Sequence, residues 1–284
     1  MKNFFRIVGI CTLFVFGFFY TEKTTTVMEN MDGLMVQIKE VSAHYKENPI
    51  EAVIHKNEMI PGVSGREVDE NKSYRSMKRV GTFNPGLLEY QSLLPEKSIK
   101  KNFSYYIVGG NPKKNMVSLL FLVDKNTDTN KLKKLVEILK IKKSKGTFFI
   151  DGYWFEENND FINYLAEENQ DLGNLSYNRD YTDSSFIWMD TIMKRVLKRK
   201  FGFCYNEKEN KVALDICKMY HNYTVRPTLT IENNPLATIK KEVQAGDIVS
   251  MRVSDETLKE LPSIITYIES KGYKIETLSD HLKE

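Results

Sequence analysis

Three acidic residues lie at positions where their carboxylates could bind a cation. Asp124 and Asp151 each follow an apolar run, and Glu207 follows a third apolar segment, near residue 204. If these runs are parallel strands, their carboxyl ends share one edge, where oxygen ligands can bind a hard cation such as Ca²⁺. Carboxylates at strand ends are also common without metal, and surface acids are the interpretation that we favour here.

The chain has only four histidines. His44 and His55 precede the regular part of the sequence, His221 comes just before an expected strand, and His281 lies in an expected C-terminal helix. We expect structural or surface histidines at all four positions.

The three cysteines include no Cys-x-x-Cys pair, which excludes a zinc–thiolate site. Cys11 lies inside an apolar run and is interpreted as a small apolar residue. Cys204 and Cys217 either form a disulfide that closes a short loop, as in exported proteins, or remain two buried thiols.

The composition is that of a folded domain. The chain has 284 residues, of which 41% are hydrophobic, enough for one large α/β domain with or without a smaller appendage. The net charge is only +3, and the basic and acidic residues are spread along the chain. This balance gives no support to nucleic-acid binding.

The N-terminus has the layout of a secretory signal. Lys2 and Arg6 precede an uncharged apolar run over residues 7–20, which is short for a bilayer core of about 30 Å. The exit at residues 17–22 reads GFFYTE, which does not have the pattern of small residues typical of a cleavage site, so a short uncleaved anchor is the alternative. We assign residues 1–26 to a signal or membrane anchor plus tether, and expect an extracytoplasmic protein, secreted or held at the membrane.

The periodicity changes along the chain. Apolar residues at helical spacing predict an amphipathic helix over 27–46, and residues 50–110 are irregular, with strand-like pieces at 87–90 and 104–108. From about 115, expected strands alternate with helices; the strands lie at 117–123, 147–150, 171–173, 223–231, 248–253 and 273–277. The pattern predicts an α/β domain with a mostly parallel sheet over 113–284, after an N-terminal helical and irregular region over 27–112.

Three segments carry a family resemblance. They are Gly146–Trp154 (GTFFIDGYW), Gly173–Arg179 (GNLSYNR) and Ala245–Val249 (AGDIV), the last followed by LPSII and KGYKI. In order and spacing they resemble the polysaccharide deacetylase (NodB-homology) family, carbohydrate esterase family 4, over roughly 115–282. The resemblance implies a distorted (β/α) barrel of about seven parallel strands, with ligands at the carboxyl ends of those strands.

The resemblance also implies a reaction whose metal-binding and catalytic residues are missing from this chain. The family has an Asp-Asp pair, two histidines four residues apart that complete a metal site, and a later histidine that protonates the departing amine. Those positions align here with Leu122 and Val123, with Leu175 and Arg179, and with Arg252. No metal or other cofactor is therefore expected.

The candidate binding residues surround the expected cleft; they are Asp124, Asp151, Trp154, Asn174, Arg179, Tyr205 and Arg252. The guanidinium groups of Arg179 and Arg252 can bind a carboxylate or phosphate of an anionic wall polymer. The alternative, slightly favoured, is that they pair with Asp180 or Asp255. Trp154 and Tyr177 offer stacking faces to sugars, although buried core aromatics are the usual explanation.

Three functions remain open. The first is a catalytically inactive polysaccharide deacetylase-family protein of the cell envelope that binds a cell-wall glycan or another anionic envelope polymer. The second is an active hydrolase with a rebuilt site that deacetylates a wall polysaccharide. The third is a structural envelope or spore-assembly protein whose partner contacts come from residues 27–110.

Overall fold

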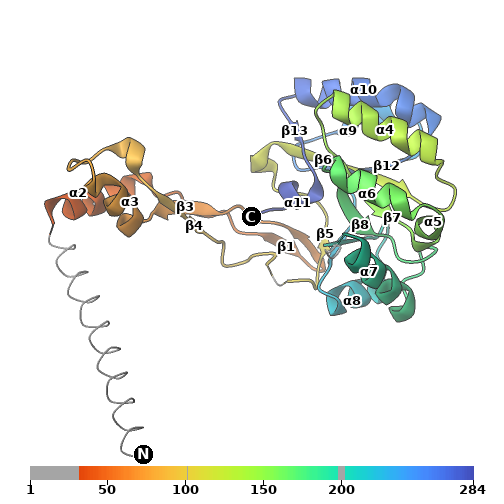
Figure 1. Cartoon of the computed structure of the whole chain (residues 1–284), viewed down its shortest axis with the longest axis horizontal. Coiled ribbons are helices and arrows are strands. Elements are labelled where there is room, and N and C mark those ends of the chain that lie inside the picture. The colour runs from red at the N-terminus through yellow and green to blue at the C-terminus, as the bar shows by residue number, and fades with distance from the viewer. Residues whose placement is uncertain (1–31, 101, 198–201) are drawn as a thin grey trace, which may run out of the picture. The chain divides into compact units, whose positions relative to one another are not determined.

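The computed structural model describes residues 32–100, 102–197 and 202–284 (Figure 1). The predicted signal or anchor over 1–26 lies outside these residues. Among the described helices, none is long and apolar enough to cross a membrane.

The contacts divide the chain into two units. Of the described residues, the smaller unit contains 32–49 and 64–94, and the larger contains 50–63 and 95–284 apart from the gaps. Residues 50–63 and 95–112, which the sequence analysis grouped with the N-terminal region, thus lie in the larger unit.

The smaller unit is built from two helices and a two-stranded antiparallel sheet. Its elements are α2 (Gly33–Ser42), η1 (Ala43–Tyr45), β3 (Gly65–Val68), α3 (Glu70–Lys78), η2 (Pro85–Leu87) and β4 (Tyr90–Leu93). Asp32 caps α2 by accepting from the Leu34 amide, and its second oxygen accepts from the Tyr74 hydroxyl at 2.9 Å. The predicted helix is therefore present over 33–42. The strand predicted at 87–90 instead begins at Tyr90 and runs to Leu93, because η2 covers Leu87.

The larger unit contains a curled, largely parallel sheet. Its strands are β1 (Val53–His55), β2 (Glu58–Ile60), β5 (Tyr106–Ile107), β6 (Met116–Val123), β7 (Thr147–Ile150), β8 (Asp171–Asn174), β9 (Phe203–Tyr205), β10 (Tyr223–Val225), β11 (Leu229–Ile231), β12 (Ile248–Arg252) and β13 (Lys274–Ile275). They run in the order β1-β2-β5-β10-β9-β8-β7-β6-β12-β11, with β13 also paired to β6. Among the described strands of this sheet, β1 and β2 form the only antiparallel pair. The sheet confirms the predicted α/β class and distorted (β/α) barrel.

Helices cover the outside of this sheet. They are α4 (Thr129–Ile141), α5 (Gly152–Glu157), α6 (Asn159–Glu167), α7 (Asp183–Leu197), α8 (Lys211–Met219), α9 (Pro235–Glu242) and α10 (Asp255–Ser270). Helix α11 (Leu278–His281) packs at one end of the barrel instead, and η3 (Pro112–Lys114) precedes β6. Figure 1 shows α4, α9 and α10 lying together on one side, where α10 contacts both of the others.

The predicted strand over 223–231 is two strands. β10 pairs with β5 and β9, whereas β11 pairs with β12 at the other end of the sheet. Pro227 lies between them, and proline has no amide hydrogen to donate to a ladder. The chain therefore leaves the sheet at Arg226, whose amide bonds Ile107, and returns at Thr228, whose amide bonds Ile248.

Strand β6 is buried on both faces. Leu119, Phe121 and Val123 face the helices, in the larger apolar cluster. Leu120 and Leu122 face the barrel interior, in a second cluster that also contains Phe149, Leu175 and Tyr205. We call this second set the inner cluster. Both faces are apolar because neither face of a parallel sheet that is covered by helices contacts solvent.

His281 closes the end of the barrel opposite the carboxyl ends of the strands. Its imidazole is buried, with Nδ1 2.8 Å from Ser118 Oγ, and a side chain at Gly110 would overlap the ring. Lys114 Nζ donates to the carbonyls of Asp280, His281 and Lys283. Burial, with a smaller effect of the Lys114 charge, lowers the pKa of His281 from 6.5 to about 3. The prediction of a structural histidine is confirmed here.

This buried histidine predicts acid sensitivity. In the unfolded chain His281 takes up a proton below about pH 6.5, but in the folded protein it stays neutral to about pH 3. The free energy of unfolding should therefore fall on acidification through this window, by up to about 1.4 kcal/mol per pH unit. Urea denaturation at several pH values measures the slope. His281→Leu should flatten it and the exposed-site control His55→Leu should not; equal slopes in all three proteins would contradict the assignment.

Cys204 and Cys217 form a disulfide that joins β9 to α8, with Cα atoms 6.3 Å apart. Both residues are buried beside Phe186 and Ala213. The structure thus decides between the two alternatives left by the sequence.

Loss of this bond should lower stability. A disulfide that closes a loop of this size is worth about 3 kcal/mol. The double variant Cys204→Ala/Cys217→Ala should unfold at a lower urea concentration, and dithiothreitol should destabilise the parent protein but not the variant. Three reactive thiols in the unfolded, unreduced parent would contradict the bond.

Candidate functional site

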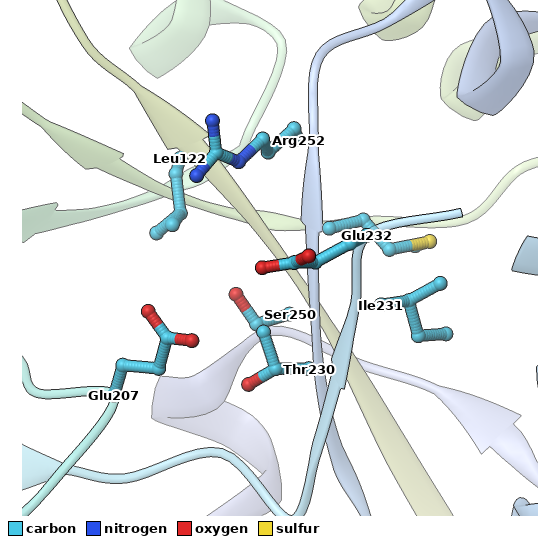
Figure 2. A pocket seen from close by; sticks show the side chains of 8 residues that line it. Leu122, Glu207, Thr230, Ile231, Glu232, Ser250 and Arg252 are labelled. Carbon is cyan, nitrogen blue, oxygen red and sulfur yellow. The ribbon is translucent and has the colours of Figure 1, made fainter.

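A pocket opens at the carboxyl edge of the sheet, between the ends of β6, β9, β11 and β12. Its cavity volume is only about 10 Å³, about the space that one water molecule needs. It is lined by Leu122, Glu207, Thr230, Ile231, Glu232, Ser250, Met251 and Arg252. Figure 2 shows the carboxylates of Glu207 and Glu232 and the guanidinium of Arg252 around it. The strand register brings these lining residues together, since Arg252 pairs with Leu122 and Thr230 pairs with Ser250.

The inner cluster forms the wall beneath this pocket. Leu122 and Leu175, which stand where the resemblance implies an aspartate and a histidine, both belong to it and are 5% and 2% exposed. Tyr205 lies in the same cluster, and its hydroxyl is 3.0 Å from Ser250 Oγ. Burial raises the pKa of Tyr205, so its hydroxyl is protonated at neutral pH. Tyr205 therefore supports the pocket through Ser250.

The donor set does not suit the metal that the resemblance implies. Aliphatic carbons and a protonated guanidinium have no lone pair for a divalent ion, and Leu122, Leu175, Arg179 and Arg252 occupy the implied positions. Within the described parts of the chain, no three histidine, cysteine, aspartate or glutamate side chains gather in a way that could hold a metal. The shifted site of Asp124, Asp151 and Glu207 is therefore not formed.

Arg252 extends into the pocket without an acidic partner. Among the described residues, no ion pair or side-chain hydrogen bond of Arg252 is formed, and its side chain is exposed. The predicted pairing with Asp255 is wrong, because Asp255 accepts from Lys131 Nζ at 2.6 Å. Of the two candidate arginines, this one remains available to a ligand.

Arg179 is paired instead with Asp124. Its Nη2 donates to Asp124 Oδ2 at 2.6 Å, and both side chains are partly buried. The predicted partner Asp180 is therefore wrong, although the pairing with an acid is confirmed. Neither Arg179 nor Asp124 lines the pocket at β12.

Asp151 holds the loop after β8. Its carboxylate accepts from the amides of Tyr153, Asn178 and Arg179 at 2.8, 3.1 and 2.9 Å. Asn178 and Arg179 have left-handed backbones, with φ of 54° and 58°, a conformation that costs on the order of 1 kcal/mol outside glycine. Burial raises the pKa of Asp151, and the three amides act against it. Asp151 therefore shapes the loop instead of lining the pocket.

Two further candidate residues belong to the core. Trp154 is 2% exposed, with Nε1 donating to the Thr127 carbonyl at 3.0 Å, so it offers no face to a sugar. Asn174 is in register with Ile150 and Cys204, whose side chains pack on the helix side of the sheet. Residues in register share a face. Asn174 therefore faces away from the pocket, and it is fully buried.

Tyr177 lies on the flank of the loop. Its hydroxyl donates to Glu156 at 2.8 Å and its ring meets Trp188 edge-on. It does not line the pocket at β12.

Sequence reasoning missed Thr230, Glu232 and Ser250. Glu232 follows directly after β11, the position at which the strand pattern places ligand contacts. Ser250 lies two residues before Arg252 on the same strand, and the period-2 alternation puts both on one face. Because residues 223–231 were predicted to form one strand, the separate role of β11 was not recognised.

Comparisons with known proteins agree with this geometry. No protein-family model matches the chain. The uncharacterized protein YlxY of Bacillus subtilis is 27% identical over 281 residues, covering 92% of this chain and 87% of that protein. The structure of BA3943 from Bacillus anthracis, described as a CE4 family pseudoenzyme, matches with a TM-score of 0.69 and 25% identity, covering 89% of this chain and 96% of that one.

Two other solved structures bear on the site. A BA3943 mutant is described as a CE4 family pseudoenzyme with restored enzymatic activity, and matches with the same TM-score and identity over 99% of that chain. PdaA of Bacillus subtilis, a family 4 carbohydrate esterase, shares the fold at 19% identity and a TM-score of 0.55, covering 65% of this chain and 86% of that one. With the motif order and the barrel, these matches show that the chain is similar to polysaccharide deacetylase-family proteins of carbohydrate esterase family 4, and most similar in extent to a CE4 family pseudoenzyme among these structures. It has leucines and arginines at positions where the resemblance implies metal-binding and catalytic residues.

Proposed function

We propose that this protein binds a cell-wall glycan at the exposed carboxyl edge of its barrel and does not hydrolyse it. One observation carries the proposal. Glu207, Thr230, Glu232 and Arg252 are polar and exposed at the carboxyl edge of the barrel, while Leu122 and Leu175 fill the positions implied for metal ligands.

The loss of hydrolysis follows from the chemistry of the implied reaction. In a metal-dependent deacetylase the ion polarises the acyl carbonyl and activates water. Leu122 and Leu175 supply no ligand atom, and the guanidinium of Arg252 is too basic to deliver a proton near neutral pH. A rebuilt hydrolase would need another donor set, and the described residues do not form one.

The pocket retains features that suit a sugar. Thr230 adds an exposed hydroxyl to a hollow whose lining includes the side chain of Leu122. Sugar rings combine apolar C–H faces with hydroxyl rims, and binding sites of mixed character match them. Arg252 adds an unpaired guanidinium, which can bind a carboxylate or phosphate on an anionic polymer.

An extracytoplasmic location supports a wall ligand. The Cys204–Cys217 disulfide suits an oxidising compartment. One structural neighbour, Bc1960, is described as a peptidoglycan N-acetylglucosamine deacetylase, at 18% identity and a TM-score of 0.57. Attachment to the membrane through residues 1–26 stays a prediction.

Binding and hydrolysis can be separated on the full-length protein. We expect no stoichiometric zinc, no acetate release from chitotetraose or peptidoglycan fragments, and measurable calorimetric binding of those fragments. Stoichiometric metal with acetate release would favour the rebuilt hydrolase. Absence of binding would favour the structural envelope role.

The two arginines provide a matched comparison. Arg252→Ala should weaken binding of anionic peptidoglycan fragments by about tenfold, equivalent to about 1.4 kcal/mol. Arg179→Ala should change it much less, because Arg179 is already paired with Asp124. Arg75→Ala, in the smaller unit, controls for the loss of a positive charge. An Arg252→Ala protein that binds as well as the control would contradict the role of the pocket.

A further inference from the structure

A groove lies on the outer surface of the barrel, along one side of α10. Its volume is about 450 Å³, within the range of about 300 to 1,000 Å³ that is typical of ligand sites. Its lining comes from α9, from α10 and from Lys142 at the end of α4, three helices that lie together in Figure 1. We call it the α10 groove.

Both charges in the α10 groove are positive. They belong to Lys142 and Lys240, and none of the described residues that line the groove is acidic. Lys142 Nζ donates to the neutral Thr266 hydroxyl at 3.1 Å, and the Tyr267 hydroxyl donates to the Lys240 carbonyl at 3.0 Å. These contacts tie α4 and α9 to α10, so one lysine stands on each side of that helix. The groove is therefore complementary to an anionic ligand.

Acids on the same helices do not neutralise these lysines. Glu260 accepts from the Leu236 amide at 2.8 Å, and Glu242 pairs with Lys241 at 3.5 Å. Glu269 is exposed but does not line the groove. Among the described residues, neither groove lysine forms an ion pair.

Hydroxyl groups and apolar surface make up the rest of the lining. Ser263, Thr266 and Ser270 are exposed, and their spacing of three and four residues puts them on one face of α10. Leu236 and Pro262 are half-buried and supply apolar surface. A polyol offers both hydroxyls and C–H groups, so a lining of this mixed character suits it.

We infer that the α10 groove binds an anionic polymer of phosphate-linked polyol units, such as glycerol phosphate. Lysine binds phosphate as a compact point charge, whereas carboxylates are matched best by the planar guanidinium of arginine, which does not line this groove. Lys142 and Lys240 bind successive phosphates, and the hydroxyls of α10 bind the polyol between them. Two lysines on different helices suit the repeated charges of a polymer better than a single anion.

The groove is separate from the glycan site proposed above. In a parallel β/α unit the helix runs back from the carboxyl end of one strand to the amino end of the next. Lys142, Lys240 and Ser270 lie at or near the C-terminal ends of α4, α9 and α10, so they lie toward the amino ends of the strands. A polymer in the groove therefore leaves Arg252 free at the carboxyl edge.

Calorimetric titration of the full-length protein with a purified oligo(glycerol phosphate) tests the site. Lys142→Gln/Lys240→Gln should weaken binding at least about tenfold, because two charge-assisted contacts are lost. Ser263→Phe, which fills the groove and keeps both lysines, should weaken it comparably. The matched control Lys133→Gln/Lys134→Gln removes the same charge from exposed positions of α4 outside the groove and should change affinity less than about twofold.

Three outcomes would overturn the inference. They are an oligomer that does not bind, a control double variant that loses as much affinity as the groove variant, and a Ser263→Phe protein that binds normally. Either of the last two would show attraction by overall charge in place of a site.

Two further ligands test the chemistry. Oligogalacturonate of the same charge should bind at least about tenfold more weakly, and equal affinity would overturn the assignment to phosphate. Phosphatidylglycerol vesicles that bind through the same two lysines more tightly than the oligomer would assign the face to a membrane instead. Arg252→Ala should leave binding of the oligomer unchanged, so failure of this site and failure of the proposed glycan site are distinguishable.

Discussion

The burial of β6 on both faces governs the site. Leu122 ends the inward row of this strand and packs in the inner cluster with Leu175, Phe149 and Tyr205. A carboxylate at residue 122 would lose its water among these apolar groups, a cost of several kcal/mol unless a cation balanced it. Aliphatic residues at 122 and 175 are thus mutually supportive, because each removes the polar partner that the other position would need. The pocket has an apolar wall where the family resemblance implies an ion.

The loop after β8 keeps its shape without metal ligands. Asp151 satisfies the amides of Asn178 and Arg179, which hold left-handed conformations, and Arg179 reaches across to Asp124. Gly173 permits the close approach of this strand to the ring of Phe149. The loop therefore depends on a buried carboxylate and one ion pair, and its geometry does not require the two implied histidines.

The fold of this protein does not depend on the charged residues at the carboxyl ends of its strands. The barrel is stabilised by its two apolar clusters, by the helices on its outer side and by the Cys204–Cys217 bond, none of which involves the pocket charges. Substitutions at the carboxyl ends of the strands can therefore change the chemistry without loss of the fold. The similarity to the BA3943 pseudoenzyme over 89% of the chain agrees with this separation.

The sequence alone determined the class of fold and the absence of the implied ligand atoms. The apolar run of β6, the strand at 147–150 and the helical spacing in α4 and α10 are local patterns, and local patterns report burial directly. The absence of metal-ligand atoms at Leu175 and Arg179 could also be recognised from the sequence, because metal coordination depends on residue type. Only the tertiary structure decided that Arg179 meets Asp124, that Asn174 faces the helices, and that Glu232 joins Glu207 and Arg252 around one pocket. These are contacts between distant segments, fixed by sheet register and by the break at Pro227, which no local pattern encodes.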